Sequence, residues 1–291
     1  MTEQSRFIIG VPTYNRSHLL ERVVASAQAQ TNTNWTLILV NDASSDDTEA
    51  VLTSYKSQLG EQLHFVSMPE NSGVNAVRNR ILDEARVLDE NAWLVLIDDD
   101  DYLTPECLSV IEQHIQAQPG YSWYTLDCQY ENGQRISRMK RHGDLSYLDD
   151  YMFGKTMRGD MTHVIKLSGV DDTRFSREFK NAEEWFFWCH LSVKHRLFAI
   201  DAIGSIKDYL PDGLTQNAFN RDKAIQVLSY KIRVLEPLVG ATRLQHQYVS
   251  LAKHYIKKKD FINAKHLLKK CWKVNPFYFR QYRYLWVLLR P

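Results

Sequence analysis

Four consecutive acidic residues, Asp98, Asp99, Asp100 and Asp101, follow a short apolar segment, WLVLI, at residues 93–97. Adjacent carboxylates repel one another unless a cation neutralises them. In an extended chain Asp98 and Asp100 point to the same side, so both could approach one ion. Carboxylate oxygens suit Mg²⁺ or Mn²⁺, which share their coordination shell with phosphate groups. The alternative is a solvated turn that caps the next helix, and we expect Asp101 to have that structural role.

Polar residues also follow the other apolar segments of the N-terminal half. In an open parallel sheet, ligands bind beyond the carboxyl ends of the strands, so we expect these residues to meet the aspartates at one edge. They are Pro12, Thr13, Tyr14, Asn15 and Arg16 after the first segment, Asp42 after the second, and Asn71, Gly73 and Arg78 after the third. Neither G-x-G-x-x-G nor G-x-x-x-x-G-K-[ST] occurs, which disfavours a Rossmann dehydrogenase or a P-loop NTPase.

The elements that would carry these residues alternate between apolar segments and amphipathic ones. Strands are predicted at 6–11, 36–41, 64–68, 93–97 and 121–128, and helices at about 17–30, 48–59, 74–88 and after Thr104 and Pro105. This alternation predicts βα units and a mostly parallel sheet flanked by helices. Residues 129–182 are interpreted as turns and residues 201–219 as loop and short strand. A helix is expected between them, at about 183–195. Three helices are expected at about 221–236, 243–258 and 260–273.

Composition is that of a globular protein, with 44% apolar and 24% charged residues in a chain of 291. The four cysteines show no CxxC pairing, which argues against a disulfide framework or a zinc ribbon and favours a reducing compartment. The N-terminal sequence has no secretory pattern, and no apolar run is long enough to span a bilayer. The expected location is therefore cytoplasmic.

Charge is distributed unevenly along the chain. Residues 1–220 carry a net charge of −12 and residues 221–291 a net charge of +13. The last segment, NPFYFRQYRYLWVLLRP, mixes aromatic residues, leucines and arginines, which suits the headgroup layer of an anionic membrane. We expect peripheral attachment to the cytoplasmic face of the inner membrane. The alternative is a solvated helical face packed on the body, and nucleic-acid binding is disfavoured because no such motif accompanies the charge.

Five short motifs give the chain a resemblance to the inverting glycosyltransferases of family 2, which have the GT-A fold. They are VPTYNR (11–16), VNDASSDDT (40–48), NSGVNAVRNRIL (71–82), LIDDDDYLTP (96–105) and AEEWFFWCHL (182–191). The fourth resembles the family's D-x-D-D-Y-L-x-P segment and the fifth its E-D-W helix start. The resemblance covers about residues 6–219. It predicts a GT-A domain at 1–219 and a basic, all-helical appendage at 220–291.

The resemblance implies roles for the residues that would hold a UDP-sugar donor. Tyr14 would lie against the base with Thr13 and Arg16 beside it, and Asp42 would accept the uracil N3–H. Pro12 and Asn71 belong to the same expected donor site. Arg78 would face the diphosphate or orient the acidic cluster. Asp98 would hold the ribose or the metal's water shell, Asp99 the ribose or the sugar, and Asp100 the Mn²⁺ or Mg²⁺ directly. The alternatives are a core aromatic for Tyr14, a helix N-cap for Asp42 and a surface charge for Arg78.

Inverting transfer needs a base on the acceptor hydroxyl. Glu183 and Glu184 are the candidates, and the resemblance points to Glu184, although the family usually has Asp at that position. Glu183 could serve instead, and the alternative is a pair of acids favoured by the helix dipole. Lys207 or Thr215 could contact phosphate. No role is expected for His142, His163 or His190, and Trp185 and Trp188 are interpreted as core.

Together these patterns predict a metal-dependent, inverting hexosyltransferase. It would move a sugar from a UDP-sugar to a saccharide or lipid-linked acceptor in surface polysaccharide or lipopolysaccharide synthesis. Two alternatives are a nucleotidyltransferase, which would need a more basic loop after the first strand, and a domain that binds nucleotide-sugar without catalysis.

Overall fold

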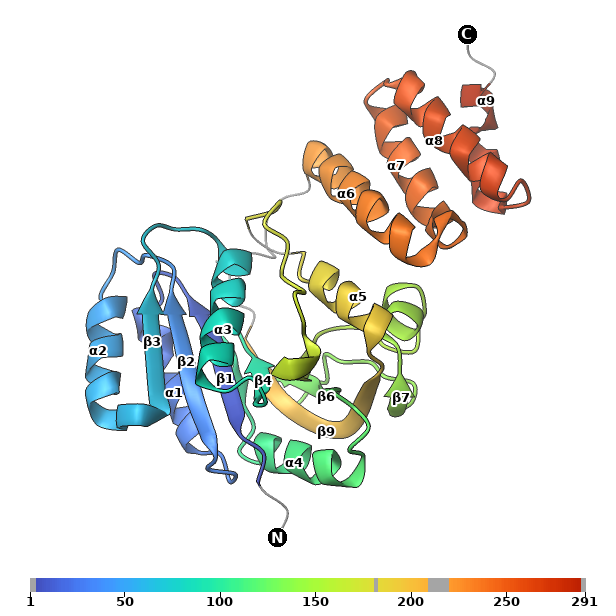
Figure 1. Cartoon of the computed structure of the whole chain (residues 1–291). Helices are drawn as coiled ribbons and strands as arrows, with labels where there is room; N and C mark the ends of the chain where they lie inside the picture. The colour runs from blue at the N-terminus through green and yellow to red at the C-terminus, as the bar shows by residue number, and fades with distance from the viewer. Residues whose placement is uncertain (1–3, 181–182, 209–219, 289–291) are drawn as a thin grey trace. The chain divides into compact units, whose positions relative to one another are not determined.

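The computed structural model of the chain describes residues 4–180, 183–208 and 220–288. These residues fall into two compact units, Met1–Leu214 and Thr215–Pro291 (Figure 1). The first unit is an α/β domain built on one sheet, and the elements of the second unit are helices wherever the structure describes it. Each unit is described separately.

Four parallel strands form the first half of the sheet, in the order β3-β2-β1-β4. Their bounds are β1 Phe7–Thr13, β2 Trp35–Asn41, β3 Leu63–Ser67 and β4 Trp93–Leu96. All seven residues of β1 and of β2 are buried, because helices cover both faces of the sheet here. The first four of the five strands expected from the apolar segments are therefore confirmed, and the fifth, expected at 121–128, is present as β6 Trp123–Tyr130.

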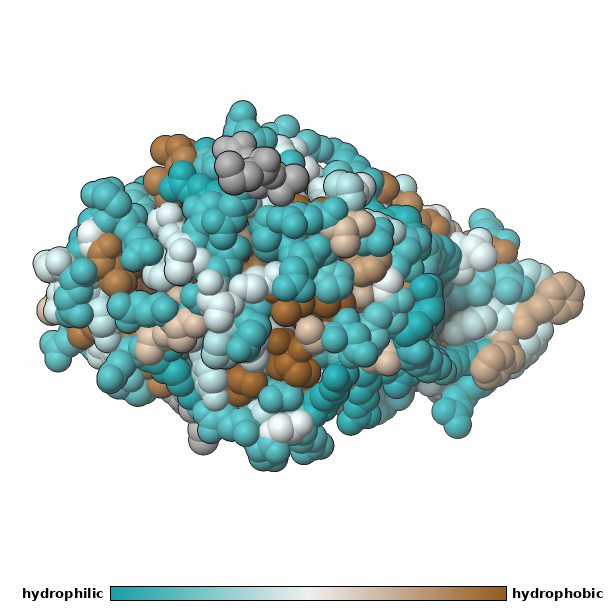
Figure 2. All heavy atoms as spheres, turned by 90° about the horizontal axis from the view of Figure 1, so that it is seen from below, coloured by the Kyte–Doolittle hydropathy of each residue, from teal (hydrophilic) through white to brown (hydrophobic). Residues whose placement is uncertain are grey.

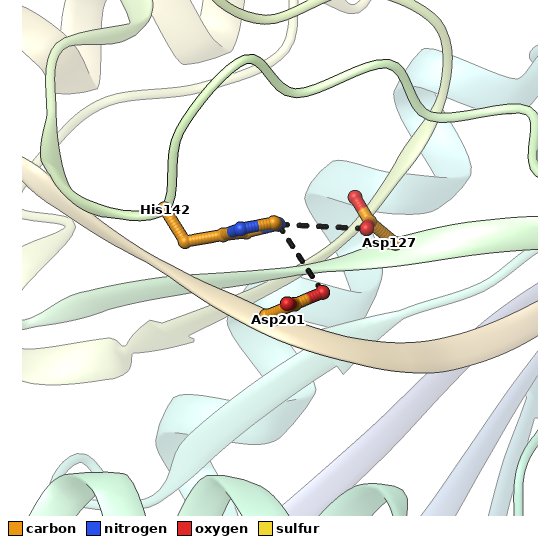
Figure 3. A group of neighbouring side chains, drawn as sticks. All are labelled: Asp127, His142 and Asp201. Carbon is orange, nitrogen blue, oxygen red and sulfur yellow. Dashed lines mark ion pairs between the residues drawn. The ribbon is translucent and has the colours of Figure 1, made fainter.

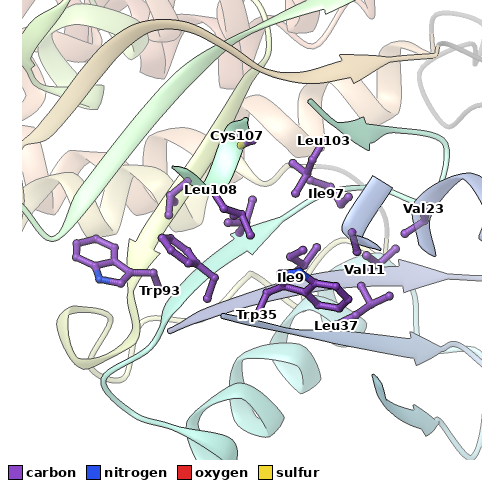
Figure 4. Packing of buried hydrophobic residues seen from close by; sticks show 14 of the residues in the cluster. Ile9, Val11, Val23, Trp35, Leu37, Trp93, Ile97, Leu103, Cys107 and Leu108 are labelled. Atoms are coloured by element: carbon purple, nitrogen blue, oxygen red, sulfur yellow. The ribbon is translucent and has the colours of Figure 1, made fainter. Parts of the chain in front are cut away.

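The helices of this half are α1 Leu20–Gln28, α2 Thr48–Leu59, α3 Val74–Leu88 and α4 Cys107–Ala117. One core joins α1, α2 and α4 to the face that carries Ile9 and Val11, and Figure 4 shows part of this packing. Helix α3 packs on the opposite face. A side chain at Gly10 would meet Ile81 of α3 at 2.4 Å, so the glycine allows α3 to approach β1 closely.

The second half of the sheet is mixed and differs most from expectation. It contains β5 Tyr102–Leu103, β6 Trp123–Tyr130, β7 Gly143–Leu145, β8 Met161–Lys166 and β9 Leu197–Lys207. Strand β8 lies antiparallel between β4 and β6, within a region interpreted from sequence as turns. Its sequence, MTHVIK, buries Thr162 and His163 as well as apolar residues, so no apolar pattern marks it. Strand β9 is longer than predicted because it runs through Asp201 and Gly204.

The helix expected after Thr104 and Pro105 is confirmed as α4. Thr104 donates its hydroxyl to the carbonyl of Ile203 at 2.8 Å, which ties the end of β5 to β9, and α4 begins at Cys107. The remaining helices of this unit are a π-helix, Tyr147–Met152, and α5, Trp185–Lys194. Short 3-10 helices occupy Ser17–Leu19, Gly60–Gln62 and Leu167–Gly169.

The second unit contains the three predicted helices as α6 Arg221–Val239, α7 Gln245–Lys257 and α8 Phe261–Val274, with a short α9 at Leu285–Leu288. Two 3-10 helices lie at Ala241–Leu244 and Phe279–Tyr284. Asn220 caps α6 and Asp260 caps α8 by accepting backbone N–H groups. Helices α7 and α8 form a hairpin that buries Leu251, Ala252, Ala264 and Leu268.

One face of the chain is largely polar. Hydrophilic residues cover most of the face shown in Figure 2, with hydrophobic residues between them in small groups. Among the described helices, none has the length and apolar character needed to cross a bilayer. The four cysteines are free and buried, as expected from their spacing.

Candidate active site

The acidic cluster lies directly after β4. Oxygens of Asp98, Asp100 and Asp101 all lie within 4.8 Å of one another. Burial and the neighbouring charge of Asp98 raise the pKa of Asp101 to about 7, although Lys207 opposes the shift. Burial and Asp98 also raise the pKa of Asp100. Three converging carboxylates that destabilise one another's charge form a donor set that fits Mg²⁺ or Mn²⁺.

Asp101 forms an ion pair with Lys207, whose ammonium donates to its carboxylate. Asp101 is 3% exposed, and Lys207 lies at the end of β9, so this ion pair fixes the acidic turn to the second half of the sheet. Lys207 thus contacts the acidic cluster, and its role toward phosphate stays a prediction. Thr215 lies outside the described residues.

Arg16 lies at the acidic cluster. One guanidinium nitrogen, Nη1, is 2.8 Å from Asp99 Oδ1 and 3.0 Å from Asp100 Oδ2. Burial opposes its charge, but the two carboxylates raise the pKa of Arg16 above its usual value. The loop after β1 is therefore joined to the loop after β4. Burial raises the pKa of Asp99 to about 6, against the effect of Arg16.

The residues around Arg16 also lie at the end of β1. Tyr14 is 45% exposed, so the alternative of a core aromatic is wrong. Thr13 is buried at the last position of the strand, and Pro12 is buried within it, beside Val40 of β2. Asn15 has a left-handed backbone, with φ of 53°, and its side chain accepts a hydrogen bond from the Ser45 N–H at 2.7 Å.

Asp42 holds the turn that precedes α3. Its two carboxylate oxygens accept the N–H groups of Ser72 and Gly73, each at 2.8 Å. The amide of Asn71 lies 3.5 Å from the Asp42 carbonyl. The alternative of an N-cap for the next helix is wrong, because that position belongs to Asp47. Each oxygen keeps a second lone pair, so recognition of a ring N–H remains a prediction.

Arg78 connects the acidic cluster to the start of α5. It is 8% exposed, so the alternative of a surface charge is wrong. Its Nη2 lies 2.8 Å from Asp98 Oδ1, and its Nη1 lies 3.2 Å from Glu184 Oε2. Burial disfavours the charge, but Asp98 and Glu184 raise the pKa of Arg78 above its usual value. A buried, fully charged arginine thus bridges the two carboxylates.

The two glutamates differ in conformation and in partner. Glu183 has a left-handed backbone, with φ of 63°, and its carboxylate accepts a hydrogen bond from the indole of Trp185. Glu184 precedes α5 directly, and its carboxylate faces Arg78. Burial and the charges of Asp98 and Asp160 raise the pKa of Glu184, while Arg78 opposes the shift. This geometry brings Glu184, and not Glu183, to the acidic cluster.

A pocket lies between these charged groups and a set of aromatic rings. Its walls include Arg78, Asp98, Glu184 and Lys207 on the charged side, and Tyr147, Tyr151, His163, Phe175 and Trp188 on the aromatic side. Trp188 is 4% exposed and stacks on Trp123, with 5.4 Å between ring centroids. It is therefore core, as expected, and also lines the pocket. Most of the aromatic wall comes from residues 129–182, where the sequence offered only aromatic content as a guide.

The sequence of the chain matches the model of the family described as "Glycosyl transferase family 2" over residues 8–183. A Campylobacter jejuni relative, GalNAc(5)-diNAcBac-PP-undecaprenol beta-1,3-glucosyltransferase, is 27% identical over 72% of this chain and 66% of its own length. The putative colanic acid biosynthesis glycosyl transferase WcaA of Escherichia coli is 36% identical over 64% of this chain and 66% of its own length. The matched part therefore spans slightly less than two thirds of these relatives.

Solved structures share the fold. S. aureus TarS 1–349 in complex with UDP-GlcNAc aligns with a TM-score of 0.70 at 16% identity, over 91% of this chain and 81% of that one. The mannosyltransferase PcManGT from Pyrobaculum calidifontis, in complex with GDP-Man and Mn²⁺, aligns with a TM-score of 0.56 at 15% identity, over 92% and 75%. The expected GT-A-type α/β fold with a helical C-terminal region is confirmed. This chain belongs to glycosyl transferase family 2.

Proposed function

We propose that the chain is an inverting glycosyltransferase that moves a hexose from a UDP-sugar to a saccharide or lipid-linked acceptor. The observation that carries the proposal is the buried Arg78, which joins Asp98 to Glu184 across one pocket. Such a site brings a base candidate and a cation-binding cluster together without direct contact between their carboxylates. The product would enter a surface polysaccharide or lipopolysaccharide.

The relatives support this choice of substrates. The C. jejuni protein is named for a PP-undecaprenol acceptor, and the E. coli protein for colanic acid biosynthesis. TarS has been solved with UDP-GlcNAc and with UDP. A UDP-sugar donor and a lipid-linked saccharide acceptor are therefore the substrates to test first.

For the donor, we assign the nucleotide to the loops after β1, β2 and β3. Tyr14, being exposed at the end of β1, offers a ring face to the base. Asp42 would read the uracil N3–H with a lone pair that its backbone contacts leave free. Pro12, Thr13 and Asn71 complete the proposed donor site. Arg16 pairs with Asp99, and we assign this pair to the ribose of the donor.

For the diphosphate, we assign Asp100 and Asp98 as ligands of Mn²⁺ or Mg²⁺, with Asp101 held beside them by Lys207. A divalent cation held there would neutralise the charge that develops on the leaving diphosphate. Arg78 keeps Asp98 oriented, and Lys207 adds positive charge at the same pocket wall.

For the acceptor, we assign Glu184 as the general base. Its carboxylate takes the proton of the acceptor hydroxyl while that oxygen bonds to the anomeric carbon and the carbon–diphosphate oxygen bond breaks. One displacement of this kind inverts the anomeric centre. The raised pKa of Glu184 makes it a stronger base than an ordinary carboxylate, and the partly buried Tyr151 offers a ring against which a sugar can lie.

The helical unit would bring the enzyme to its acceptor at the cytoplasmic face of the inner membrane. Its exposed apolar and aromatic residues include Ile262 at 85%, Phe277 at 84%, Phe279 at 71% and Trp272. Lys269 and Lys273 line an apolar hollow together with Trp272 and Leu288. Exposed rings beside lysines suit an anionic headgroup layer.

The deciding experiment is transfer from a panel of UDP-sugars to an undecaprenyl-diphosphate-linked saccharide, with the product's anomeric configuration read by NMR. Inverted product supports the proposal. Retained configuration overturns the single displacement. Binding of UDP-sugar with neither transfer nor hydrolysis supports a binding domain, and release of diphosphate from a nucleoside triphosphate supports a nucleotidyltransferase.

A further inference from the structure

A second group of ligand-type side chains lies apart from the acidic cluster, on β6, β9 and the turn before β7. Asp127 comes from β6, Asp201 from β9, and His142 precedes Gly143, the first residue of β7. Figure 3 shows the His142 ring directed toward both carboxylates. Histidine spacing in the sequence gave no reason to expect this group, because its members are 15 and 59 residues apart.

The distances fit one small ion. His142 Nε2 lies 3.5 Å from Asp127 Oδ2 and 3.7 Å from Asp201 Oδ1. One ligand atom from each of the three residues lies within 4.8 Å of the others. Tetrahedral Zn²⁺ with ligands about 2.1 Å away requires neighbouring ligand atoms to be about 3.4 Å apart. A slight contraction would complete a His-Asp-Asp site with water in the fourth position.

The polar atoms of this group are incompletely satisfied. Asp127 is 1% exposed, and its Oδ1 has no hydrogen-bond partner among the described residues. His142 Nε2 is buried and also lacks a hydrogen bond within the described part of the chain, because its approach to the two carboxylates is long. Buried polar atoms without partners cost free energy, and a cation bound to His142 Nε2 would remove that cost at this atom.

The backbone is shaped around this group. The register between β6 and β9 shifts on both sides of Asp127, and Asp201 lies in the extra stretch of β9 between Ile200 and Ile203. Bulges re-aim side chains that regular pairing would point elsewhere. The side chain of Asp201 is 64% exposed, so an ion can reach the group from solvent.

The positive charge of Arg135 pairs with both carboxylates of this group. Its Nη1 lies 2.7 Å from Asp127 Oδ2 and 3.3 Å from Asp201 Oδ1. The side chain of Arg135 is 52% exposed, so it can turn away into water without unfolding its surroundings. Arg135 and a metal ion would therefore compete for the same two carboxylates.

We propose that Asp127, His142 and Asp201 form a site for Zn²⁺, distinct from the acidic cluster, that clamps β6, β9 and β7 together. Imidazole with carboxylates is a donor set that Zn²⁺ prefers over Mg²⁺. The site needs no nucleotide, so it can be tested whether or not sugar transfer is established.

The test is isothermal titration of the full chain with ZnCl₂ in the absence of nucleotide. Apart from any Zn²⁺ that the acidic cluster takes up, we expect a site that His142→Ala and Asp201→Asn each weaken at least about tenfold. Arg135→Ala removes the competing cation, so we expect it to bind Zn²⁺ more tightly than the unmodified protein. A structural ion pair alone would not produce that gain.

His64→Ala is the matched control. His64 also contacts a carboxylate, that of Glu84 at 2.8 Å, which in turn accepts from Arg80, but among the described residues no second acidic side chain joins this pair in a group that could hold a metal ion. Its substitution should leave Zn²⁺ binding unchanged. Asp201 is exposed, so Asp201→Asn decides the matter if His142→Ala fails to fold. Zn²⁺ binding that is absent, or equal in unmodified protein and Asp201→Asn, overturns the proposal.

Discussion

The Nη1 of Arg78 lies 3.2 Å from Glu184 Oε2, while its Nη2 holds Asp98 at 2.8 Å. One guanidinium therefore fixes the distance between the proposed base and the proposed metal ligands. Arg78 is buried, and the ring of Phe175 lies 5.6 Å from its guanidinium carbon, so protein atoms and not water surround the charge. The electrostatics of the two carboxylates are consequently coupled through this residue.

Arg78→Lys tests that coupling. Lysine keeps the charge but cannot present two nitrogens in a planar fork, so we expect it to keep the nearer carboxylate, Asp98, and to release Glu184. We expect kcat to fall by roughly 100-fold, in line with loss of a positioned acid–base group. Because Arg78 holds the pKa of Glu184 down, the acidic limb of the kcat–pH profile should move to higher pH. An unshifted limb would show that Arg78 does not act on the base.

Glu184→Gln and Glu183→Gln form a matched pair of neighbouring, isosteric changes. Removing the base should lower kcat by about 10²- to 10⁴-fold at Glu184. The change at Glu183 should have a much smaller effect, because its carboxylate contacts Trp185 and not Arg78. Single-turnover transfer measures both. A larger loss at Glu183 would reverse the assignment.

Asp100→Asn tests the metal ligands through binding alone. In the unmodified protein, Mn²⁺ should tighten UDP binding by at least about tenfold, because the diphosphate and the carboxylates share the ion. The variant should bind UDP equally with and without Mn²⁺. Lys140 is exposed and is not part of the acidic cluster, so Lys140→Gln should retain the effect of Mn²⁺ on UDP binding. Titration calorimetry gives both values, and full metal linkage in Asp100→Asn would rule out that ligand.

His163 predicts a pH dependence of stability. It is 8% exposed and accepts a hydrogen bond from Trp123 Nε1 at 3.2 Å, and burial lowers its pKa to about 3. Below pH about 6.5 the unfolded chain binds a proton there that the folded chain does not, so stability falls as pH falls.

The cost should approach about 1.4 kcal/mol per pH unit between the unfolded and folded pKa values. Urea denaturation of the unmodified protein and His163→Gln at pH 7, 6 and 5 measures it. The difference in free energy of unfolding between the two proteins should shift in favour of the variant as pH falls. A difference that stays constant with pH would mean that His163 titrates normally in the fold.

If the helical unit contacts the membrane, binding to anionic vesicles should weaken when the exposed lysines of α8 are replaced. Each lysine near an anionic surface contributes about 1 kcal/mol, so Lys269→Gln with Lys273→Gln should lower partition onto phosphatidylglycerol vesicles by roughly 30-fold. Both side chains are exposed, so folding should be unaffected. Lys140→Gln, in the first unit, should change partition little. Equal sedimentation of the double variant and the unmodified protein would contradict the proposal.

The sequence was most informative where burial is uniform. Strands β1 and β2 are apolar at nearly every position because both faces are covered, and this pattern located four strands and the residues that follow them. Strand β8 escaped prediction because it buries Thr162 and His163. Strand β9 was expected only as a short strand because it passes through Asp201 and Gly204. Local patterns cannot reveal polar residues whose partners come from distant strands.

The candidate site, like the fold, was only partly predictable from the sequence. Residues at strand ends could be gathered by topology alone, but the pairing of Arg16 with Asp99 and of Arg78 with Glu184 depends on side-chain geometry. The aromatic wall was not predictable, because Tyr147, Tyr151 and Phe175 reach the pocket from a π-helix and a loop without strong periodicity. The family resemblance pointed to Glu184 over Glu183, but the left-handed backbone of Glu183 was not predictable from the sequence.

The most direct measurement is an anomalous difference map, collected at the manganese edge, from crystals grown with UDP and MnCl₂. We predict a peak between the UDP diphosphate and the Asp98 and Asp100 carboxylates, with Glu184 on the open side of the pocket. A map in which UDP is bound but no manganese lies at those carboxylates would contradict the metal-dependent mechanism.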